Sequence, residues 1–270
     1  MYALALHDSE LRTDAEVAAM EDTYANESDF ARLFDEDCII FGSTGPQGVV
    51  ARLVTGCLSL KRETIDGFRT VEGEASNRFG PRLPRERPDG TFGLTNDVPK
   101  SVRVPGETDY IGWVDATPRE PFCRPTAWAI ERPDMLEMSR QYERDVNQIY
   151  LEELPHHWRE QMDYMKAVSK QFKYLDSPYS TITVNRNVRT PYHTDKNDFR
   201  GGMGNLVVLD GGGDDSGIIV MPRERVAFRV RPGDVLFMNV HALHGNLALT
   251  PGKERLTTVL YARENLHECI

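Results

Sequence analysis

The feature that most constrains the fold is a change of hydrophobic period after Ser177. From there on, short runs rich in β-branched and aromatic residues follow one another, separated by turn sequences such as DGGGDDSG and RPGD. The runs are STITVNRNV, NLVVLD, GIIVM, RVAFRV, GDVLFMNV and RLTTVLYA. Six strands within about ninety residues, without a helical pattern between them, predict an antiparallel sandwich or barrel over 177–270.

The segment before this block contains shorter signals for strands and loops. IIFGSTGPQGVVARLVTGCL, residues 39–58, predicts two short strands around a glycine-rich turn. Between Phe68 and Arg132 prolines and glycines recur, as in NRFGPRLPRERPDG. This punctuation predicts a long loop instead of regular structure, and such loops are usually functional or disordered.

Two core-packing helices are predicted between that loop and the strands. In the first, Asp134 and Glu137 stand at capping-box spacing, and apolar residues follow at intervals of three and four. The second begins near Pro155. Its apolar face comprises Leu154, Trp158, Met162 and Met165.

The formal net charge of −10 is unevenly distributed along the chain. Residues 1–40 carry eleven acidic residues and two arginines, whereas the other 230 carry 31 acidic residues and 30 lysines and arginines. We expect 1–40 to be an acidic arm, a solvated helix or surface segment, and 41–270 to be one globular domain in which 41–176 packs on a β core. Because the body is close to neutral, a nucleic-acid partner is not excluded.

Cysteine usage and hydropathy bear on the compartment. The four cysteines, Cys38, Cys57, Cys123 and Cys269, lie far apart and form no CxxC pair. This argues against a structural zinc site or a dense disulfide framework and favours a reducing compartment. No apolar run is long enough to span a bilayer. We therefore expect a cytoplasmic monomer without a membrane partner.

The stretch TPYHTDKNDFRGG places His193 and Asp195 two positions apart, just after a predicted strand. In an extended segment, an imidazole and a carboxylate at this spacing can take adjacent positions on a divalent metal. His241 and His244, in HALHGN, are both candidates for a third ligand. Two histidines and a carboxylate that leave open positions on the metal are typical of non-haem Fe(II) oxygenases, whereas zinc hydrolysis needs fewer open positions.

An arginine in the last strand run, Arg255, adds a second chemical signal. An arginine that faces the inside of a small barrel is costly unless an anion pairs with it. A dicarboxylate cosubstrate would provide that anion.

These residues resemble the Fe(II)/2-oxoglutarate dioxygenase superfamily. More narrowly, VNRNVRTPYHTDKND, GDVLFMNVHALHGN and RLTTVLYAR are similar to the TET/JBP family of DNA 5-methylpyrimidine oxygenases, particularly its short phage and bacterial members. FCRPTAWAIERPD also resembles that family's segment before the helices. The resemblance implies a mainly β fold with flanking helices, in which 177–270 is a double-stranded β-helix catalytic core of the jelly-roll or cupin-like type.

The resemblance also implies a ligand set. Fe(II) would bind His193, Asp195 and His244, and Arg255 would pair with the distal carboxylate of 2-oxoglutarate. Ten residues separate His244 from Arg255, which is followed by Thr257 in an Arg-x-Thr pattern that many superfamily members share, whereas thirteen would follow His241. His241 is then a neighbour that supports the site. The further cosubstrate contacts that we expect are Arg124, Asn185 and Thr257.

The implied reaction consumes O2 and 2-oxoglutarate and converts the 5-methyl group of 5-methylcytosine, or secondarily thymine, in DNA to hydroxymethyl. Because that base is stacked in the duplex, it must be flipped into the pocket. The candidate substrate contacts are Tyr192, Asn197, Asp198, Arg189, Arg263, Arg82 and Arg85. As a set, Arg78, Arg82, Arg85 and Arg87 would line a phosphate track.

Two other functions compete with this one. A free amino-acid hydroxylase of the same superfamily would keep the iron chemistry and lose DNA. A cupin-like binding domain would have no catalysis, so succinate formation separates it from both enzymes, and the substrate separates the two enzymes from each other.

Overall fold

The structure is a computed structural model that describes residues 1–42, 48–73, 106–117, 120–211 and 216–269, together with the backbone of 83–86 and 92–95. All six strands predicted after Ser177 are present. They are β9 Thr181–Arg186, β10 Gly204–Gly211, β11 Ile219–Met221, β12 Val226–Phe228, β13 Val235–Met238 and β15 Arg255–Tyr261. A further two-residue strand, β14 Gly245–Asn246, lies between the last two.

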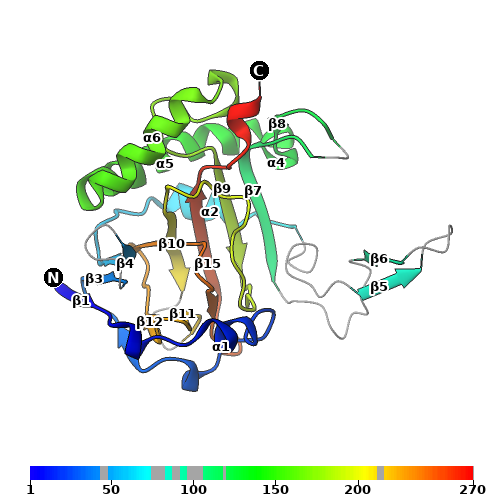
Figure 1. Ribbon diagram of the computed structural model, residues 1–270. Helices are drawn as coiled ribbons and strands as arrows, with labels where there is room; N and C mark the ends of the chain where they lie inside the picture. Colours follow the sequence, from blue (N-terminus) through cyan, green and yellow to red (C-terminus); the bar gives the residue numbers. More distant parts are fainter. Residues whose placement is uncertain are drawn as a thin grey trace.

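These strands form two sheets (Figure 1). In the larger sheet β15 pairs antiparallel with β10 on one side and β9 on the other, and β13 pairs antiparallel with β10. In the smaller sheet β11 pairs antiparallel with β12 and β14. The strands after Ser177 are therefore divided between two sheets and pair antiparallel within each, which confirms the antiparallel sandwich predicted from the strand pattern.

Segments before residue 177 widen the larger sheet. β3 Cys38–Phe41 and β4 Val49–Val54 pair antiparallel and join it beside β13, which confirms the two strands predicted over 39–58. β7 Glu107–Val114 pairs with β9, and β8 Arg124–Pro125 pairs with the end of β7. The prediction of a loop from Phe68 to Arg132 is wrong over β7 and over the short helix α4 Ala127–Glu131. In β7 the buried pairing of Ile111 and Trp113 outweighs the surrounding glycines and prolines.

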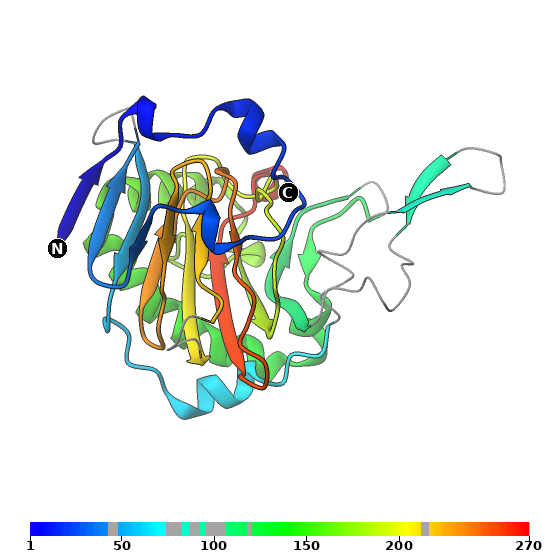
Figure 2. The same ribbon diagram turned by 90° about the horizontal axis from the view of Figure 1, so that it is seen from below.

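A separate hairpin, β5 Leu83–Glu86 and β6 Phe92–Thr95, also falls inside the predicted loop. It lies away from the two sheets in both ribbon views (Figures 1 and 2).

The acidic arm lies at the surface, as predicted, but it is not one solvated helix, because two of its segments join the sheets as strands. β1 Tyr2–Ala5 pairs parallel with β3 in the larger sheet, and β2 Arg32–Phe34 pairs parallel with β12 in the smaller one. Between them lies α1 Asp14–Ala18, capped by the side chain of Thr13. Both strands are too short to show a period in the sequence, so their partners decide the outcome. The division of the chain at residues 40 and 176 stays a prediction.

Helices cover the face of the larger sheet that points away from the smaller sheet (Figure 2). They are α2 Arg62–Phe68, α4 Ala127–Glu131, α5 Pro133–Glu153 and α6 Pro155–Ala167, and the short 3-10 helices are η1 Asp8–Glu10, η2 Glu27–Asp29, η4 Lys170–Phe172 and η5 Leu266–Glu268. The two predicted helices are confirmed as α5 and α6. The capping box is wrong: α5 begins at Pro133, and Asp134 instead forms an ion pair with Arg132.

Two apolar layers hold these parts together. One lies between the helices and the larger sheet and includes Tyr150 and Phe237. The other fills the space between the sheets and includes Leu206 and Phe228. Among the described cysteines, Cys123 and Cys269 form a disulfide with a Cα–Cα distance of 5.9 Å, while Cys38 and Cys57 are free. In the part of the chain that the structure describes, no helix is both long and apolar enough to cross a membrane.

Candidate metal centre

Main-chain pairing brings together two histidines that are far apart in the sequence. His193 lies in the loop after β9, and His244 directly precedes β14. The N–H of His193 donates to the carbonyl of His244 at 2.9 Å, and the reciprocal bond measures 3.0 Å. Their ring centroids are consequently 4.4 Å apart.

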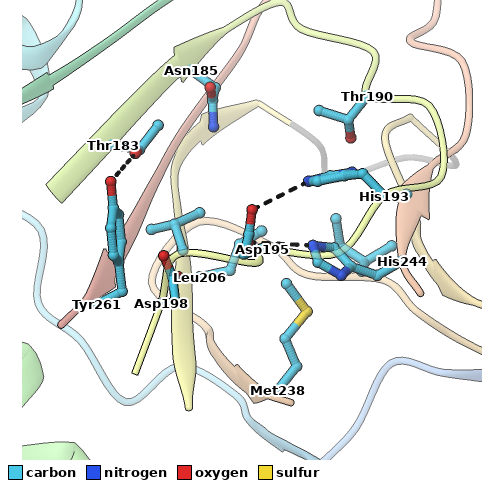
Figure 3. Close-up of a pocket in the computed structure, with 13 residues that line it drawn as sticks. Thr183, Asn185, Thr190, His193, Asp195, Asp198, Leu206, Met238, His244 and Tyr261 are labelled. Atoms are coloured by element: carbon cyan, nitrogen blue, oxygen red, sulfur yellow. Dashed lines mark hydrogen bonds and ion pairs between the residues drawn. The ribbon is translucent and has the colours of Figure 1, made fainter. Parts of the chain in front are cut away.

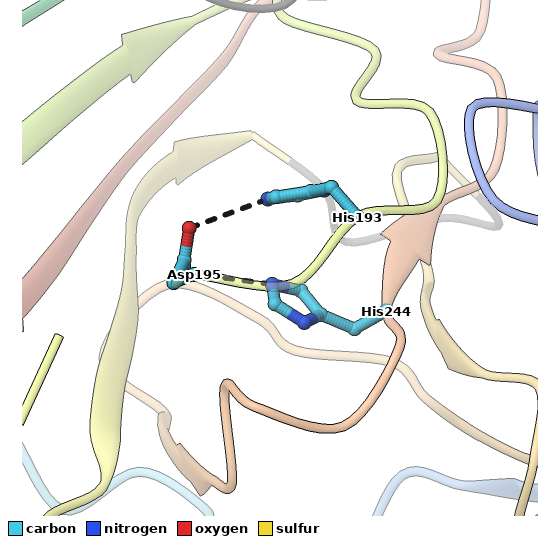
Figure 4. Close-up of side chains that lie close together, drawn as sticks. All are labelled: His193, Asp195 and His244. Atoms are coloured by element: carbon cyan, nitrogen blue, oxygen red, sulfur yellow. Dashed lines mark ion pairs between the residues drawn. The ribbon is translucent and has the colours of Figure 1, made fainter. Parts of the chain in front are cut away.

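Asp195 completes the cluster from the same loop. Its N–H donates to the carbonyl of Val240 at 2.9 Å, which anchors the loop to the chain just after β13. One carboxylate oxygen lies 3.7 Å from Nε2 of His193 and the other 3.7 Å from Nε2 of His244 (Figure 4). The three ligand atoms lie within 4.8 Å of one another. Two imidazoles and one carboxylate at this separation suit a divalent metal.

The far nitrogen of each ring fixes its orientation. Nδ1 of His193 lies 2.9 Å from the carbonyl of Pro191, and Nδ1 of His244 lies 2.9 Å from the carbonyl of Ala242. A carbonyl only accepts, so each Nδ1 carries the proton and each Nε2 offers its lone pair to the cluster. Burial also lowers the pKa of His244, which favours the neutral imidazole that a metal requires.

The other candidate for the third ligand, His241, is not part of this cluster. Its backbone N–H donates to Oδ1 of Asn239 at 3.0 Å, and its Nε2 is buried without a hydrogen-bond partner in the described structure. The structure therefore brings His244, and not His241, together with His193 and Asp195.

A pocket opens beside the cluster, between the two sheets (Figure 3). Polar side chains on its wall include Thr183, whose hydroxyl donates to the hydroxyl of Tyr261 at 3.3 Å. Its apolar wall consists of Leu206, Ile219, Met238 and Val259. The pocket thus combines a metal-type cluster with a largely apolar chamber.

Arg255 lies on the inward face of β15. Side chains alternate along a strand, so Arg255 shares the face of Val259 and Tyr261, which line the pocket. The side chain is buried, and its Nε and Nη2 have no hydrogen-bond partner among the described residues. Burial lowers the pKa of Arg255 to about 10, so the guanidinium stays charged at neutral pH. A buried cation without a partner is the counterpart expected for an anionic ligand.

The other predicted cosubstrate contacts divide into two groups. Thr257 is buried on the same face of β15 as Arg255, and Asn185 lines the pocket, where it accepts a hydrogen bond from Thr108 at 2.6 Å. Arg124 does not line the pocket. It forms an ion pair with Glu120 near β8, so a role for Arg124 in cosubstrate binding finds no support in the structure.

Among the predicted substrate contacts, Asp198 and Arg263 lie together at the pocket. Asp198 lines the wall, and its backbone pairs with that of Arg263. Nη1 of Arg263 is 3.1 Å from Asp115, and its guanidinium carbon lies 5.9 Å from the ring centre of Tyr261. Asn197 is exposed and does not line the pocket.

Two predicted substrate contacts point elsewhere. Tyr192 is fully buried outside the pocket, and its hydroxyl donates to Asp29 at 2.9 Å, so it is not available to stack on a base. Arg189 covers the ring of Tyr24 at 4.4 Å and donates to the carbonyl of Ala25. Arg78, Arg82 and Arg87 lie outside the described residues, and Arg85 is described only as backbone in β5.

Asn246 is a site residue that the sequence analysis missed. Its Oδ1 accepts from the backbone N–H of Thr190 at 2.7 Å and from the hydroxyl of the same residue. Its amide donates to the carbonyls of Val188 and Leu247. Asn246 therefore joins the loop that carries His193 to the strand after His244. The sequence signal that could have identified Asn246 is its position two residues after His244 in HALHGN.

The site can now be compared with known proteins. The Tet_JBP family model, described as the oxygenase domain of the 2OGFeDO superfamily, matches residues 115–264, more than half of the chain. The chain belongs to the Tet/JBP oxygenase family. The resemblance predicted from the sequence is thereby confirmed, and the matched range contains His193, Asp195, His244 and Arg255.

Named relatives of this Tet/JBP chain include much longer proteins. It is 29% identical over 230 residues to the bifunctional helicase and thymine dioxygenase JBP2 of Leishmania infantum, covering 75% of this chain and 20% of that protein. It is 34% identical over 181 residues to the thymine dioxygenase JBP1 of Trypanosoma brucei brucei, covering 65% of this chain and 20% of that protein. The chain thus spans about a fifth of the length of these curated relatives.

Among solved structures, NgTET1 in complex with 5mC DNA superposes with a TM-score of 0.60 at 15% identity, covering 88% of this chain and 80% of that one. At this identity the likeness concerns the fold. It confirms the prediction of a mainly β protein with a double-stranded β-helix core.

Proposed function

We propose that this chain is an Fe(II)- and 2-oxoglutarate-dependent dioxygenase that hydroxylates the 5-methyl group of a pyrimidine in DNA. The observation that carries the proposal is the pairing, inside one Tet/JBP fold, of a His-Asp-His cluster with a buried arginine for which the described residues provide no counter-anion. A cupin-like binding domain would use that arginine only for an anionic ligand, and it would form no succinate.

The residues present fit the metal and its cosubstrate. His193, Asp195 and His244 would hold Fe(II), with both imidazoles already in the tautomer that exposes Nε2. Arg255 would pair with the distal carboxylate of 2-oxoglutarate, and Thr257 lies on the same face of β15. When bound, the iron supplies the activation of O2 that is coupled to oxidative decarboxylation of the cosubstrate.

The protein's own part in the reaction is to shape and dry the chamber. Leu206, Ile219, Met238 and Val259 line it, so little water competes with a methyl group placed beside the cluster. All the candidate ligands come from one chain, which is consistent with the proposed monomer.

For the base, the candidates that line or adjoin the pocket are Asp198 and Arg263. A carboxylate accepts from the N4 amino group of cytosine, a donor that thymine lacks. We therefore place 5-methylcytosine first and thymine second, although JBP relatives are named thymine dioxygenases. Because the pocket lies between two sheets, the base would have to leave the duplex stack to reach it.

The deciding experiment supplies Fe(II), 2-oxoglutarate and O2 with duplex DNA that contains 5-methylcytosine, followed by nuclease digestion and mass spectrometry of nucleosides. We expect 5-hydroxymethylcytosine, with none formed by Asp195→Ala. Unmodified nucleosides alongside a hydroxylated free amino acid would favour the amino-acid hydroxylase. Absence of succinate with every substrate would favour a non-catalytic domain.

A second measurement tests how DNA is held. If Arg78, Arg82, Arg85 and Arg87 contact phosphates, neutralising all four to glutamine weakens DNA binding and flattens its dependence on salt, because fewer counterions are released. An unchanged salt slope would assign this segment a structural role.

A further inference from the structure

We infer that residues 13–30 of the acidic arm act as a strap that positions the metal centre. The inference rests on the proposed function in so far as it assigns His193, Asp195 and His244 to a metal. It adds a positioning role for a segment that contributes no ligand and lies outside the region matched by the family model.

The first contact is a pair of main-chain hydrogen bonds next to a ligand. The N–H of Asp22 donates to the carbonyl of Tyr192 at 2.9 Å, and the N–H of Tyr192 donates to the carbonyl of Thr23 at 2.8 Å. Tyr192 directly precedes His193, which pairs in turn with His244. The segment that presents the first ligand is therefore held between the arm on one side and the second histidine on the other.

Side chains reinforce this contact. The hydroxyl of Tyr192 donates to Oδ2 of Asp29 at 2.9 Å, and the same oxygen accepts from the backbone N–H of Asn26 at 2.8 Å. Arg189, four residues before His193, donates to the carbonyl of Ala25 and covers the ring of Tyr24. One face of the loop before the ligands thus binds the arm.

The arm also packs against the second ligand segment. Ala25 and Tyr192 are buried in one apolar cluster with Leu243, the residue before His244. Val17, Met20 and Phe30 of the arm pack against the same cluster. The blue segment containing α1 runs beside β11 and β12 at this end of the sandwich (Figures 1 and 2). Both residues that directly precede the histidine ligands are therefore covered by one strap.

Regular structure does little to fix the ligands themselves. β9 ends at Arg186, well before His193, and β14 contains only two residues. The pairing of His193 with His244 is an isolated bridge outside the named strands. Gly245 allows Tyr192 to approach closely, since a Cβ at this position would lie 3.0 Å from the tyrosine ring. Besides the bonds from Asp195 to Val240 and from Thr190 to Asn246, the separation of the ligands thus depends on what packs outside the loop, and the arm packs there.

The first test uses Tyr192→Phe, with Tyr174→Phe as a matched control. Tyr174 is buried to a similar degree, and its hydroxyl also makes one 2.9 Å hydrogen bond, to Ser139, but on the helical side of the larger sheet. Titration with Co(II) alone, followed by its visible absorption, measures the metal site without turnover. Loss of one hydrogen bond that positions the ligands weakens Co(II) binding about fivefold in Tyr192→Phe. Tyr174→Phe loses similar thermal stability and keeps wild-type affinity.

Equal Co(II) affinity in wild type and Tyr192→Phe would overturn the strap. Failure of the wild type to bind Co(II) would instead refute the proposed function, and a second readout then still tests the strap.

Ala25→Asp places a charge in the shared cluster. We expect faster amide hydrogen exchange in 13–30 and 189–195 together, with β9 and β15 unchanged. Faster exchange in the arm alone would show that the loop does not depend on it.

Discussion

The two ends of the candidate site, the His-Asp-His cluster and Arg255 at the start of β15, hold their polar groups in opposite ways. At the metal end, the nitrogens of His193 and His244 that face away from the cluster both donate to main-chain carbonyls at 2.9 Å. At the other end, Arg255 is buried like His244, yet its Nε and Nη2 have no partner in the described structure. The outward-facing nitrogens of the cluster have hydrogen-bond partners within the protein, whereas two nitrogens of Arg255 have none among the described residues.

This difference bears on how each end would bind its ligand, a metal ion at the cluster and an anion at Arg255. A preorganised ligand set binds a metal without rearrangement, because tautomer and ring orientation are already fixed. A buried guanidinium without an anion instead destabilises the empty protein, and the deficit is recovered only when an anion arrives. If these residues bind the metal and the cosubstrate proposed above, the metal end would be occupied without conformational change, and binding of the cosubstrate at the arginine end would stabilise the protein.

The largest expected effect tests the metal end. His244→Ala removes one of three protein ligands, so we expect it to abolish turnover and to weaken Fe(II) or Co(II) binding by more than the roughly 100-fold loss typical of outer partners. His241→Ala keeps the metal and loses at most part of the activity. Metal titration of both variants checks this, and the reverse order would transfer the ligand role to His241. His193→Ala and Asp195→Ala belong with His244→Ala.

The second effect tests the arginine end and carries two opposite signs. Arg255→Met removes a charge-assisted pair with the cosubstrate, worth about 1.5–3 kcal/mol, and so raises the 2-oxoglutarate concentration needed for succinate formation by at least about tenfold. The same change removes a buried unpaired charge, so the protein without ligand unfolds at a higher temperature. Succinate assays and calorimetry measure the two quantities.

Arg124→Met is the matched control for that experiment. Arg124 is a further cosubstrate contact predicted from the sequence, but it pairs with Glu120 at a partly exposed position. Such pairs contribute little, about 0–1 kcal/mol. We expect an unchanged 2-oxoglutarate requirement. A shift equal to that of Arg255→Met would mean that the effect is not specific to a pair between Arg255 and the cosubstrate.

The sequence predicts the parts of this pocket that lie on regular strands and in short-range motifs. The strands after Ser177 have a clear period, and HxD with a distal histidine and arginine identified the cluster before any coordinates. Tyr192 shows where this reasoning stops. It adjoins a ligand in the chain, but successive side chains in an extended segment point to opposite sides, so Tyr192 turns into the core while His193 faces the pocket.

Long-range pairing accounts for the remaining misses. β1 and β2 are four and three residues long, and neither has a pattern that separates it from a loop. They form strands because β3 and β12 offer free edges. In the same way, Asn246 accepts a hydrogen bond from Thr190, 56 residues earlier in the chain, a contact that spacing does not encode. A single sequence shows periods and motifs, but not which distant edge a short segment will meet.

The smallest expected effect concerns Glu143, which is buried like Arg255 but has a hydrogen-bond partner and lies away from the pocket. Glu143, on α5 in the helical layer, accepts a hydrogen bond from Ser177. Burial raises the pKa of Glu143 to about 7, although the bond from Ser177 acts in the opposite direction. The folded protein therefore holds this proton more tightly than the unfolded chain, whose glutamate has its ordinary pKa of 4.5.

The sign of the pH dependence follows from that order. The stability contributed by the protonated carboxyl is fully present below about pH 4.5 and is lost as the pH rises through about 7. Urea unfolding of the wild type should thus show a free energy that falls between pH 5 and pH 7.5, by on the order of 1–2 kcal/mol. Glu143→Gln removes this group's share and flattens the slope, whereas the exposed Glu152→Gln on the same helix leaves it unchanged. If Glu143→Gln retained the wild-type slope, Glu143 would be ionised in the folded protein. Arg255 and Glu143 would then both be examples of a buried charge without a counter-charge.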